Sequence, residues 1–466
     1  MMQAFDLGIA HGEERREFAD RASERLAEDG VEVVLVGFSD NAGVTRARAV
    51  PLARFSDAVC DGVGLSSAWH VVTATDRVTT SKYVGNPAGD IRLVADPRAA
   101  APVPGLDGFA WAPADLAEKD GTVHPCCARS LLRGAVQRLE RLGLRAHVGY
   151  ELEWWCTPHR GVGSGQDLEP SHDGPAVGVL PLLHLAPMVR ELLRDCSGAP
   201  VAVEAVNAEY SNGQLECSLS PKEPVAAVDA NVLARLAIHA AAERHGYRAS
   251  FAPAFSGPMG NGGHLHLSLW REGENCFASG GGPAGMGSEA AAFVAGMLEH
   301  LDAITAIGAP TVASYLRLRP SRWAGAWRCW GVENREAALR LVAVAPGRER
   351  LANVEVKCFD EAANPYLLLA ALLHAGADGI ERTLTLPPAY AGDPAGATEH
   401  ERAQAGVARL PASLGAAIES MTSSAFLADL LGPALFDSYL AVRREELAAF
   451  EGASDDEIVA AYLFRY

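Results

Sequence analysis

Four segments of the chain alternate polar and apolar residues with a period of two, the pattern of a β-strand with one polar and one buried face. The clearest are "VGYELEWWC" at residues 148–156 and "GNGGHLHLSLW" at residues 260–270. A strand places Glu151 and Glu153 on one face, and it does the same for His264, His266 and Ser268. This alternation limits the fold to one that contains a sheet with a polar side.

The other two segments repeat the pattern. "VEAVNAEYSNGQLECSLS" carries Glu204, Glu209 and Glu216 around a Ser-Asn-Gly turn, and "NVEVKCFDEAANPYLLL" carries Glu355 and Lys357 two residues apart. Each segment alone also fits an exposed strand with solvated side chains. Together they predict a funnel with a polar, metal-binding interior, because neighbouring carboxylates in an apolar wall repel one another unless a cation lies between them.

The predicted ligand set indicates the metal. Carboxylate oxygens with one imidazole suit Mg²⁺ or Mn²⁺ better than Zn²⁺, which favours more Cys and His. Three arginines lie in neighbouring motifs, Arg317 in "SYLRLRPS" and Arg335 and Arg340 in "ENREAALRL". Magnesium beside arginines implies a bound phosphate. No G-x-x-x-x-G-K-[ST] is present, so a P-loop is excluded.

Size and charge exclude several classes of protein. The 466 residues suffice for two or three domains, and we place one boundary near residue 120, which gives an N-terminal domain (1–120) and a catalytic domain (121–466). A net charge of −18 argues against nucleic acid or an anionic membrane as partner. The longest apolar run, "PYLLLAALLHAGADGI", is too short for a bilayer and predicts a buried helix.

Cysteine usage and the N-terminus indicate the compartment. The nine cysteines are scattered and form no C-x-x-C, and "MMQAFDLGIAHGEERREF" has no basic stretch followed by an apolar run. Reduced thiols and no signal peptide predict a cytoplasmic protein. Residues 11–30, which overlap the end of this segment, predict an amphipathic helix that ends at Gly30, and Val31 to Asp40 predicts a strand.

The order of these motifs resembles glutamine synthetase, type I, across nearly the whole chain. The resemblance is carried by "ELEWW", "NAEYSNGQLE", "GGHLHLSLW", "SYLRLRP", "NREAALRL", "VEVK", "ANPYLLLAALLHAGADGI" and "RLPASLGAAIE". It implies an α+β fold, in which an N-terminal β-grasp domain precedes a catalytic domain whose antiparallel sheet forms a funnel surrounded by helices. It also implies an enzyme that phosphorylates the γ-carboxylate of glutamate with ATP and then lets an amine displace the phosphate.

The resemblance also implies a role for each matching residue. One metal ion would be bound by Glu153, Glu209 and Glu216, and a second by Glu151, His264 and Glu355. ATP would contact Glu204, His266 and Ser268, and its phosphates would contact Arg335 and Arg340, with Arg335 counted as catalytic. Glutamate would contact Gly260, Arg317 and Lys357. Two to three Mg²⁺ or Mn²⁺ ions and one ATP are expected at each site.

Two departures from the family bear on the amine. The family's ammonium-binding aspartate stands before two serines, whereas "VGLSSAW" has Gly64 there and keeps Ser67. The family's flap glutamate is Trp323 in "PSRWAG". A site without both carboxylates binds a desolvated ammonium ion poorly, while an indole attracts a carbon-bearing amine through apolar contact and cation–π attraction.

The departures therefore indicate the branch of γ-glutamyl-amine ligases. We take ethanolamine as the first choice of acceptor, because one bulky indole leaves limited room, and a polyamine as the second. Two alternatives are an ammonia-using glutamine synthetase and a non-catalytic protein on the same fold. At the γ-carboxylate, Lys357 replaces the family's arginine and keeps the charge without the bidentate fork. The resemblance further implies a dodecamer of two hexameric rings, in which Gly64 and Ser67 face the funnel of the next chain.

Overall fold

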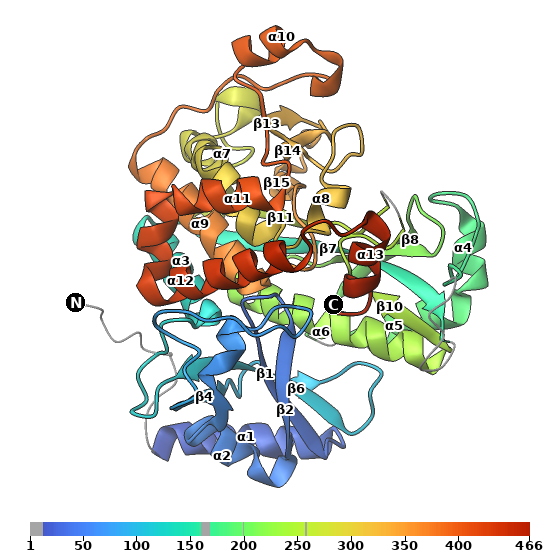
Figure 1. Cartoon of the computed structure of the whole chain (residues 1–466), viewed down its shortest axis with the longest axis vertical. Coiled ribbons are helices and arrows are strands. Elements are labelled where there is room, and N and C mark those ends of the chain that lie inside the picture. The colour runs from blue at the N-terminus through green and yellow to red at the C-terminus, as the bar shows by residue number, and fades with distance from the viewer. Residues whose placement is uncertain (1–12, 160–167, 199, 257–258) are drawn as a thin grey trace.

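The computed structural model describes residues 13–159, 168–198, 200–256 and 259–466. Figure 1 shows the N-terminal segment, in blue, as a unit below the rest of the chain. Its sheet has the order β2-β1-β6-β4-β3, with β5 paired to β6. The pairing of β1 with β6 is parallel, and the other pairings are antiparallel. The strands are β1 (Val33–Ser39), β2 (Thr45–Pro51), β3 (Val63–Ser66), β4 (Asp90–Ala95), β5 (Ala101–Pro102) and β6 (Phe109–Ala117).

The predicted first helix and first strand are confirmed. α1 (Glu13–Glu28) ends before Gly30, whose φ is 76°, and β1 follows it. Ala19, Ala22 and Leu26 on one side of α1 are buried in a core shared with the N-terminal sheet. The other helices of this segment are η1 (Leu52–Arg54), α2 (Phe55–Cys60) and the 3-10 turn η2 (Ser67–Val71).

The rest of the chain is built around a ten-stranded sheet with the order β16-β13-β14-β15-β11-β7-β9-β8, where β10 adds to β7 and β12 to β11. In this sheet, only β13 and β14 pair in parallel among the described residues. The α+β fold class is therefore confirmed. The strands are β7 (Arg145–Pro158), β8 (Val203–Ala208), β9 (Gln214–Leu219), β10 (Tyr247–Ser250), β11 (Gly263–Arg271), β12 (Glu274–Asn275), β13 (Trp327–Val332), β14 (Ala337–Val342), β15 (Asn353–Val356) and β16 (Ala408–Arg409).

Helices cover the apolar face of this sheet (Figure 1). The predicted buried helix is α9 (Pro365–Glu381), and Asn364 caps it by accepting a hydrogen bond from Leu367 N. It packs closely on α7 (Ser288–Gly308), where a Cβ at Gly296 would lie 2.1 Å from Ala375 O. The remaining helices are α3 (Ala128–Arg141), α4 (Val179–His184), α5 (Ala186–Asp195), α6 (Pro224–Arg244), η3 (Pro283–Gly285), α8 (Ser314–Arg317), η4 (Glu349–Leu351), η5 (Pro394–Gly396), α10 (Glu399–Gln404), α11 (Leu414–Thr422), α12 (Ala425–Ala449) and α13 (Asp455–Tyr462).

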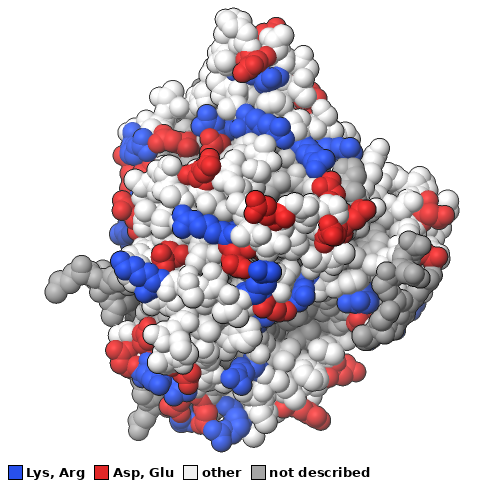
Figure 2. Space-filling view, viewed as in Figure 1, with Lys and Arg blue, Asp and Glu red and all other residues white. Residues whose placement is uncertain are grey.

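Three described helices, α6, α7 and α12, are long and apolar enough to cross a membrane by length and composition alone. The helix α9, whose apolar run the sequence predicts to be too short for a bilayer, is not among them. In α6 and α7 most of the apolar stretch is buried inside the protein, 67% and 78% respectively, so their hydrophobic residues already have a packing partner. On the surface seen in Figure 2, acidic and basic side chains are interspersed rather than gathered into one basic face.

A buried group of charges connects the N-terminal sheet to the helices of the second unit. Arg129 on α3 is 4% exposed and donates to Asp96 Oδ2 and Asp115 Oδ2 at 3.0 Å each and to Asp229 Oδ2 at 2.7 Å. Asp96 and Asp115 belong to the N-terminal unit, and Asp229 lies on α6. A single guanidinium thus compensates carboxylates from both units.

Replacing Arg129 with Leu should destabilise the protein by about 3–5 kcal/mol, because Asp229 loses its ion pair and the buried Asp96 and Asp115 each lose one of the guanidinium groups that compensate them. Urea unfolding of the two proteins measures the difference in free energy of unfolding. The control is Arg54→Leu, which removes a surface ion pair with Asp57 and should cost at most about 1 kcal/mol. Equal losses in the two variants would contradict the proposed importance of the buried group.

Candidate active site

Cross-strand register brings the predicted ligands together on the polar face of the ten-stranded sheet. His264 on β11 is opposite Glu151 on β7, and Glu153 is opposite Glu216 on β9. On the other side of β11, His266 is opposite Glu355 on β15. The residues between them, such as Leu152 and Leu265, are buried in the core below, so the alternation seen in the sequence separates site from core.

Glu151 lies at the centre of the group. Its Oε2 is 3.2 Å from His264 Nδ1, and its Oε1 is 3.2 Å from His266 Nε2. His264 Nδ1 is also 3.6 Å from Glu355 Oε1, and its Nε2 is 3.8 Å from Glu153 Oε1. His264 is therefore close to three carboxylates, and His266 is close to Glu151.

There are two sets of residues in which the ligand atoms all lie within 4.8 Å of one another. The residues in each set differ from those that the family resemblance implies. The sets are Glu151 with Glu216 and His264, and Glu151 with His266 and Glu355. In the family-based expectation, Glu216 belongs with Glu153 and Glu209, and His266 contacts ATP. Glu153 Oε2 instead accepts hydrogen bonds from Gln214 Nε2 at 2.9 Å and from Gly262 N at 2.7 Å. The assignment of each residue to one metal stays a prediction.

The carboxylates of the group differ in their proton affinity. Burial, together with the charges of Glu151, Glu153 and Glu209, raises the pKa of Glu216 to about 9, and burial with Glu153 raises that of Glu209. Burial also opposes ionisation of Glu151, but hydrogen bonds from His264 and His266 outweigh it and lower its pKa. A divalent cation beside Glu216 would replace its proton, and a donor set dominated by oxygen fits Mg²⁺ or Mn²⁺.

Cationic side chains gather at Glu355, which is 1% exposed. Lys357 Nζ is 2.8 Å from its Oε1, and Arg340 Nη1 is 2.9 Å from its Oε2. Burial opposes ionisation, but Lys357, His264 and His266 lower the pKa of Glu355 to about 2. Arg340 also pairs with Glu333. Arg335 is exposed in the turn between β13 and β14, five residues before Arg340.

Arg317 is placed to bind an anion. It is 7% exposed at the end of α8, and its Nη2 donates to Lys357 O at 3.1 Å and to Phe359 O at 2.8 Å. Its Nη1 is buried and has no hydrogen-bond partner among the described residues. Beside it, a Cβ at Gly262 would lie 2.9 Å from Arg317 Nη2 and 2.7 Å from His264 Nε2, and one at Gly260 would lie 1.8 Å from Pro253 O. These glycines leave the backbone close to the guanidinium.

Two predicted ATP contacts lie toward the edge of the group. Glu204 is exposed on β8, where it accepts from Ser220 Oγ at 2.9 Å. Ser268 on β11 accepts from Trp270 Nε1 at 2.9 Å. Glu209 follows β8 and accepts from Asn207 Nδ2 at 2.8 Å.

The loop that carries Trp323 is fixed by a carboxylate that sequence reasoning missed. Glu336 is 6% exposed, and its two oxygens accept from Trp323 N at 2.8 Å and from Ser321 N at 3.1 Å. Trp323 has a φ of 53° and its side chain is 65% exposed. Glu336 follows Arg335 directly in "ENREAALRL", so its place in that motif was the available signal. Gln214, which bonds Glu153, was missed as well.

Gly64 and Ser67 lie in the N-terminal unit, on β3 and in η2. Gly64 pairs with Arg92 of β4. Within the described residues, no hydrogen bond or ion pair connects either residue to the ten-stranded sheet. Their expected place in the funnel of a neighbouring chain stays a prediction.

This geometry defines a class of protein, an enzyme whose sheet presents carboxylates, imidazoles and arginines together, and comparison with known proteins identifies the family. A family model described as "Glutamine synthetase, catalytic domain" matches residues 125–462, and one described as "Glutamine synthetase N-terminal domain" matches residues 19–124. The chain belongs to the glutamine synthetase family and is an ATP-dependent ligase.

Individual relatives refine this placement. The chain is 42% identical to a γ-glutamylpolyamine synthetase of Streptomyces coelicolor over 97% of each chain, and 31% identical to a glutamine synthetase of Pyrococcus furiosus over 87% of this chain and 88% of that one. Among solved structures, a novel glutamine synthase homolog aligns with a TM-score of 0.82 at 33% identity, covering 94% of this chain and 99% of that one. A complex of GmaS with ADP aligns with a TM-score of 0.78 at 27% identity, covering 92% and 96%.

The raised pKa of Glu216 predicts how stability depends on pH without metal. Its pKa of about 9 in the folded chain lies above the ordinary glutamate value of 4.5, so the folded state binds an extra proton between these values. Stability contributed by this proton is present at low pH and lost as pH rises toward 9. Melting temperatures in EDTA should therefore fall less steeply with pH in Glu216→Gln than in the wild type.

Added Mn²⁺ should flatten the wild-type profile, because the cation replaces the proton. The matched control is Glu204→Gln, which removes a carboxylate from the exposed edge and should leave the slope unchanged. A Glu216→Gln profile parallel to that of the wild type would show that Glu216 is ionised in the metal-free protein.

Proposed function

We propose that the protein joins the γ-carboxylate of glutamate to a primary amine of a polyamine, using ATP and passing through γ-glutamyl phosphate. The observation that carries the proposal is the 42% identity, over 97% of each chain, to a γ-glutamylpolyamine synthetase. It reverses the order of acceptors expected from sequence, in which ethanolamine came first. The argument for ethanolamine was limited room beside Trp323, but that residue is 65% exposed and therefore does not close off the space around it.

The chain's own residues support each part of the reaction. Family members use ATP and divalent metals, and bound cations would supply charge neutralisation at the phosphates. We propose two to three Mg²⁺ or Mn²⁺ ions, held by Glu151, Glu153, Glu209, Glu216, His264 and Glu355. Arg335 and Arg340 would bind the transferring phosphoryl group, where a fixed positive charge stabilises the transition state. Glu204, His266 and Ser268 would contact the nucleotide.

Glutamate would be oriented by groups beside the cluster. The buried Nη1 of Arg317 lacks a partner among the described residues and would pair with the α-carboxylate. Gly260 would let the substrate approach the backbone. Lys357, which lies 2.8 Å from Glu355, would carry the positive charge nearest the γ-carboxylate. One lysine gives a point charge rather than a bidentate clamp, so orientation depends more on Arg317.

The amine would be selected both by the carboxylates that the acceptor side lacks and by the indole that it carries. Gly64 and Trp323 stand where the family has ammonium-binding carboxylates, so a small bare cation finds no paired charge. The indole offers an aromatic face to an alkylammonium group. The net charge of −18 attracts a polycation over a distance and favours its capture. We further propose a cytoplasmic dodecamer in which Gly64 and Ser67 complete the site of the next chain.

The first test is a panel of amines. With glutamate, ATP and Mg²⁺, spermidine or putrescine should release phosphate with a kcat/KM at least about 100-fold above that of ammonium, because the site lacks the groups that bind the small ion. Mass spectrometry identifies the glutamylated product. Ammonium turned over as well as the polyamines would indicate a glutamine synthetase, and the absence of phosphate release with every amine would indicate a non-catalytic protein.

A second test concerns Trp323. Replacing it with Ala should lower kcat/KM for the polyamine about 5–30-fold, the loss of a cation–π contact of about 1–2 kcal/mol, while the KM for ATP stays unchanged. The control is Arg322→Ala, which alters the adjacent exposed residue of the same loop. An unchanged order of amine preference in Trp323→Ala would exclude the indole from the acceptor site.

A further inference from the structure

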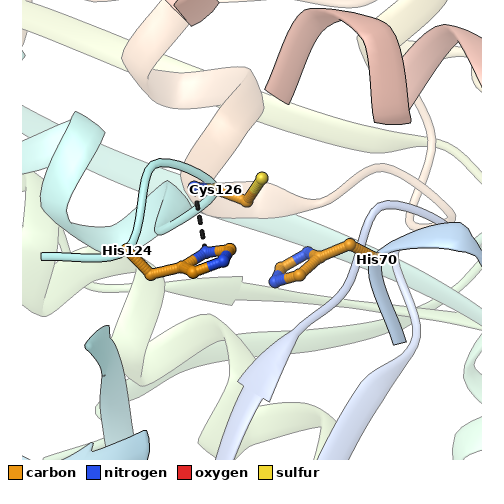
Figure 3. Close-up of side chains that lie close together, drawn as sticks. All are labelled: His70, His124 and Cys126. Atoms are coloured by element: carbon orange, nitrogen blue, oxygen red, sulfur yellow. Dashed lines mark hydrogen bonds between the residues drawn. The ribbon is translucent and has the colours of Figure 1, made fainter. Parts of the chain in front are cut away.

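A second group of metal-ligating side chains lies away from the funnel, between the N-terminal unit and the rest of the chain. His70 lies in η2, and His124 and Cys126 lie in the connection between β6 and α3. They are 1%, 3% and 3% exposed, respectively. Figure 3 shows the two imidazoles directed toward one another, with the thiol beside the space between them.

The geometry is compact enough to surround one ion. One nitrogen from each histidine and the sulfur of Cys126 lie within 4.8 Å of one another. The ring centroids of His70 and His124 are 5.2 Å apart, and the planes differ by 9°. Cys126 belongs to the same short segment as His124, and its N donates to His124 Nδ1 at 3.2 Å.

His70 is the side chain that packing alone does not explain. Neither of its ring nitrogens has a hydrogen-bond partner among the described residues, although the ring is buried. Buried polar atoms are nearly always paired, because an unpaired one loses its hydrogen bonds to water without replacement. Burial lowers the pKa of His70 to about 3 and that of His124 to about 4, so both rings are neutral and keep a lone pair for a ligand.

We propose that His70, His124 and Cys126 bind one transition-metal ion, and that Zn²⁺ is the ion this donor set fits best. Two imidazoles and a thiolate are typical ligands of Zn²⁺, whereas Mg²⁺ and Mn²⁺ prefer oxygen. A water molecule completes a tetrahedral shell, or the hydroxyl of Ser438, whose Oγ is 3.9 Å from Cys126 Sγ, takes that place. The site is separate from the proposed function and does not depend on it.

Binding changes the protonation of the ligands. Burial raises the pKa of the Cys126 thiol to about 12, so the thiol proton is released to solvent when sulfur binds the cation. Because His124 Nδ1 accepts the Cys126 N–H, the proton of that ring is on Nε2. Coordination through Nε2 moves this proton to Nδ1 and opens that hydrogen bond. One proton thus leaves the protein for each bound ion.

The ion would hold three parts of the chain together. Asn41, in the turn after β1, donates to His70 O at 2.8 Å and to Ser438 Oγ of α12 at 3.1 Å. The ligands themselves come from η2 and from the connection to α3. Since η2 also carries Ser67, the bound ion would fix the turn that the proposed function places at the site of the next chain.

Cobalt spectroscopy of the full-length protein tests the proposal. Metal-free protein titrated with Co²⁺ in excess Mg²⁺ should develop a thiolate-to-cobalt charge-transfer band in the near ultraviolet, saturating at one Co²⁺ per chain. The carboxylates and imidazoles of the active site cannot produce this band, because they contain no sulfur. Zn²⁺ should abolish it by displacement. Absence of the band in the wild-type protein would overturn the proposal.

Variants locate the ligand. Cys126→Ser should remove the band and weaken Zn²⁺ binding more than about 100-fold, a larger effect than the loss of an outer-shell partner. The control is Cys127→Ser, because the adjacent thiol is also buried but contacts Leu116 N and Asp115 instead. His70→Asn should weaken binding as well, and Zn²⁺ should then no longer raise the melting temperature. A band that survives in Cys126→Ser, or that is lost in Cys127→Ser, would refute the assignment.

Discussion

Repulsion among carboxylates on one face of the ten-stranded sheet is the constraint that the rest of the structure has to accommodate. Glu151 and Glu153 lie on β7, and Glu153 is directly opposite Glu216 on the adjacent strand β9. On the opposite face of the sheet, Leu152, Leu265 and Val356 are at most 1% exposed. A slip of one residue in any of these pairings would place carboxylates in the core and leucines in the site. Burial of the apolar face thus fixes the register of the strands. That register in turn places the carboxylates close enough to repel one another.

The two sides of the cluster meet this repulsion in different ways. Around Glu355 the protein supplies its own positive charge through Lys357 and Arg340, and the pKa of that carboxyl is low despite burial. Around Glu216 the charge of Lys357 offsets only part of the effect of burial and of repulsion from Glu151, Glu153 and Glu209, and the pKa of Glu216 is raised to about 9. One half of the site is therefore compensated by the protein's own charges, and an added cation would be needed to compensate the other half. This asymmetry is the strongest physical support for a metal-dependent enzyme.

The sequence was sufficient to predict the features that depend on local patterns, above all on the alternation of polar and apolar residues. The period of two identified the strands and the polar faces of Glu151 and His264, and the capping residue Asn364 located the start of the buried helix α9. Register between strands was not available, because the sequence does not specify which residue is opposite which. The two groupings of Glu151, one with Glu216 and His264 and one with His266 and Glu355, became visible only through strand pairing.

Residues whose role depends on a loop, or on contact between the two units, were harder to predict from the sequence. Glu336 was passed over because its role depends on the backbone of Trp323, thirteen residues away and in a conformation with positive φ. His70 and His124 are 54 positions apart and neither belongs to a spaced motif. Chemistry that depends on distant segments meeting cannot be read from local periodicity, and both features required the fold.

The loop at Trp323 is held through its backbone and can therefore carry different side chains at position 323. A bulky residue at a φ of 53° is unfavourable, and the two hydrogen bonds that Glu336 accepts from this loop offset the strain. The donors are backbone N–H groups, so the bonds hold the loop whatever side chain position 323 carries. The side chain is free to vary while the loop keeps its shape. Under the proposed function, exchange of a carboxylate for an indole there would alter which amine is attracted and would leave the phosphate-binding groups of the sheet in place.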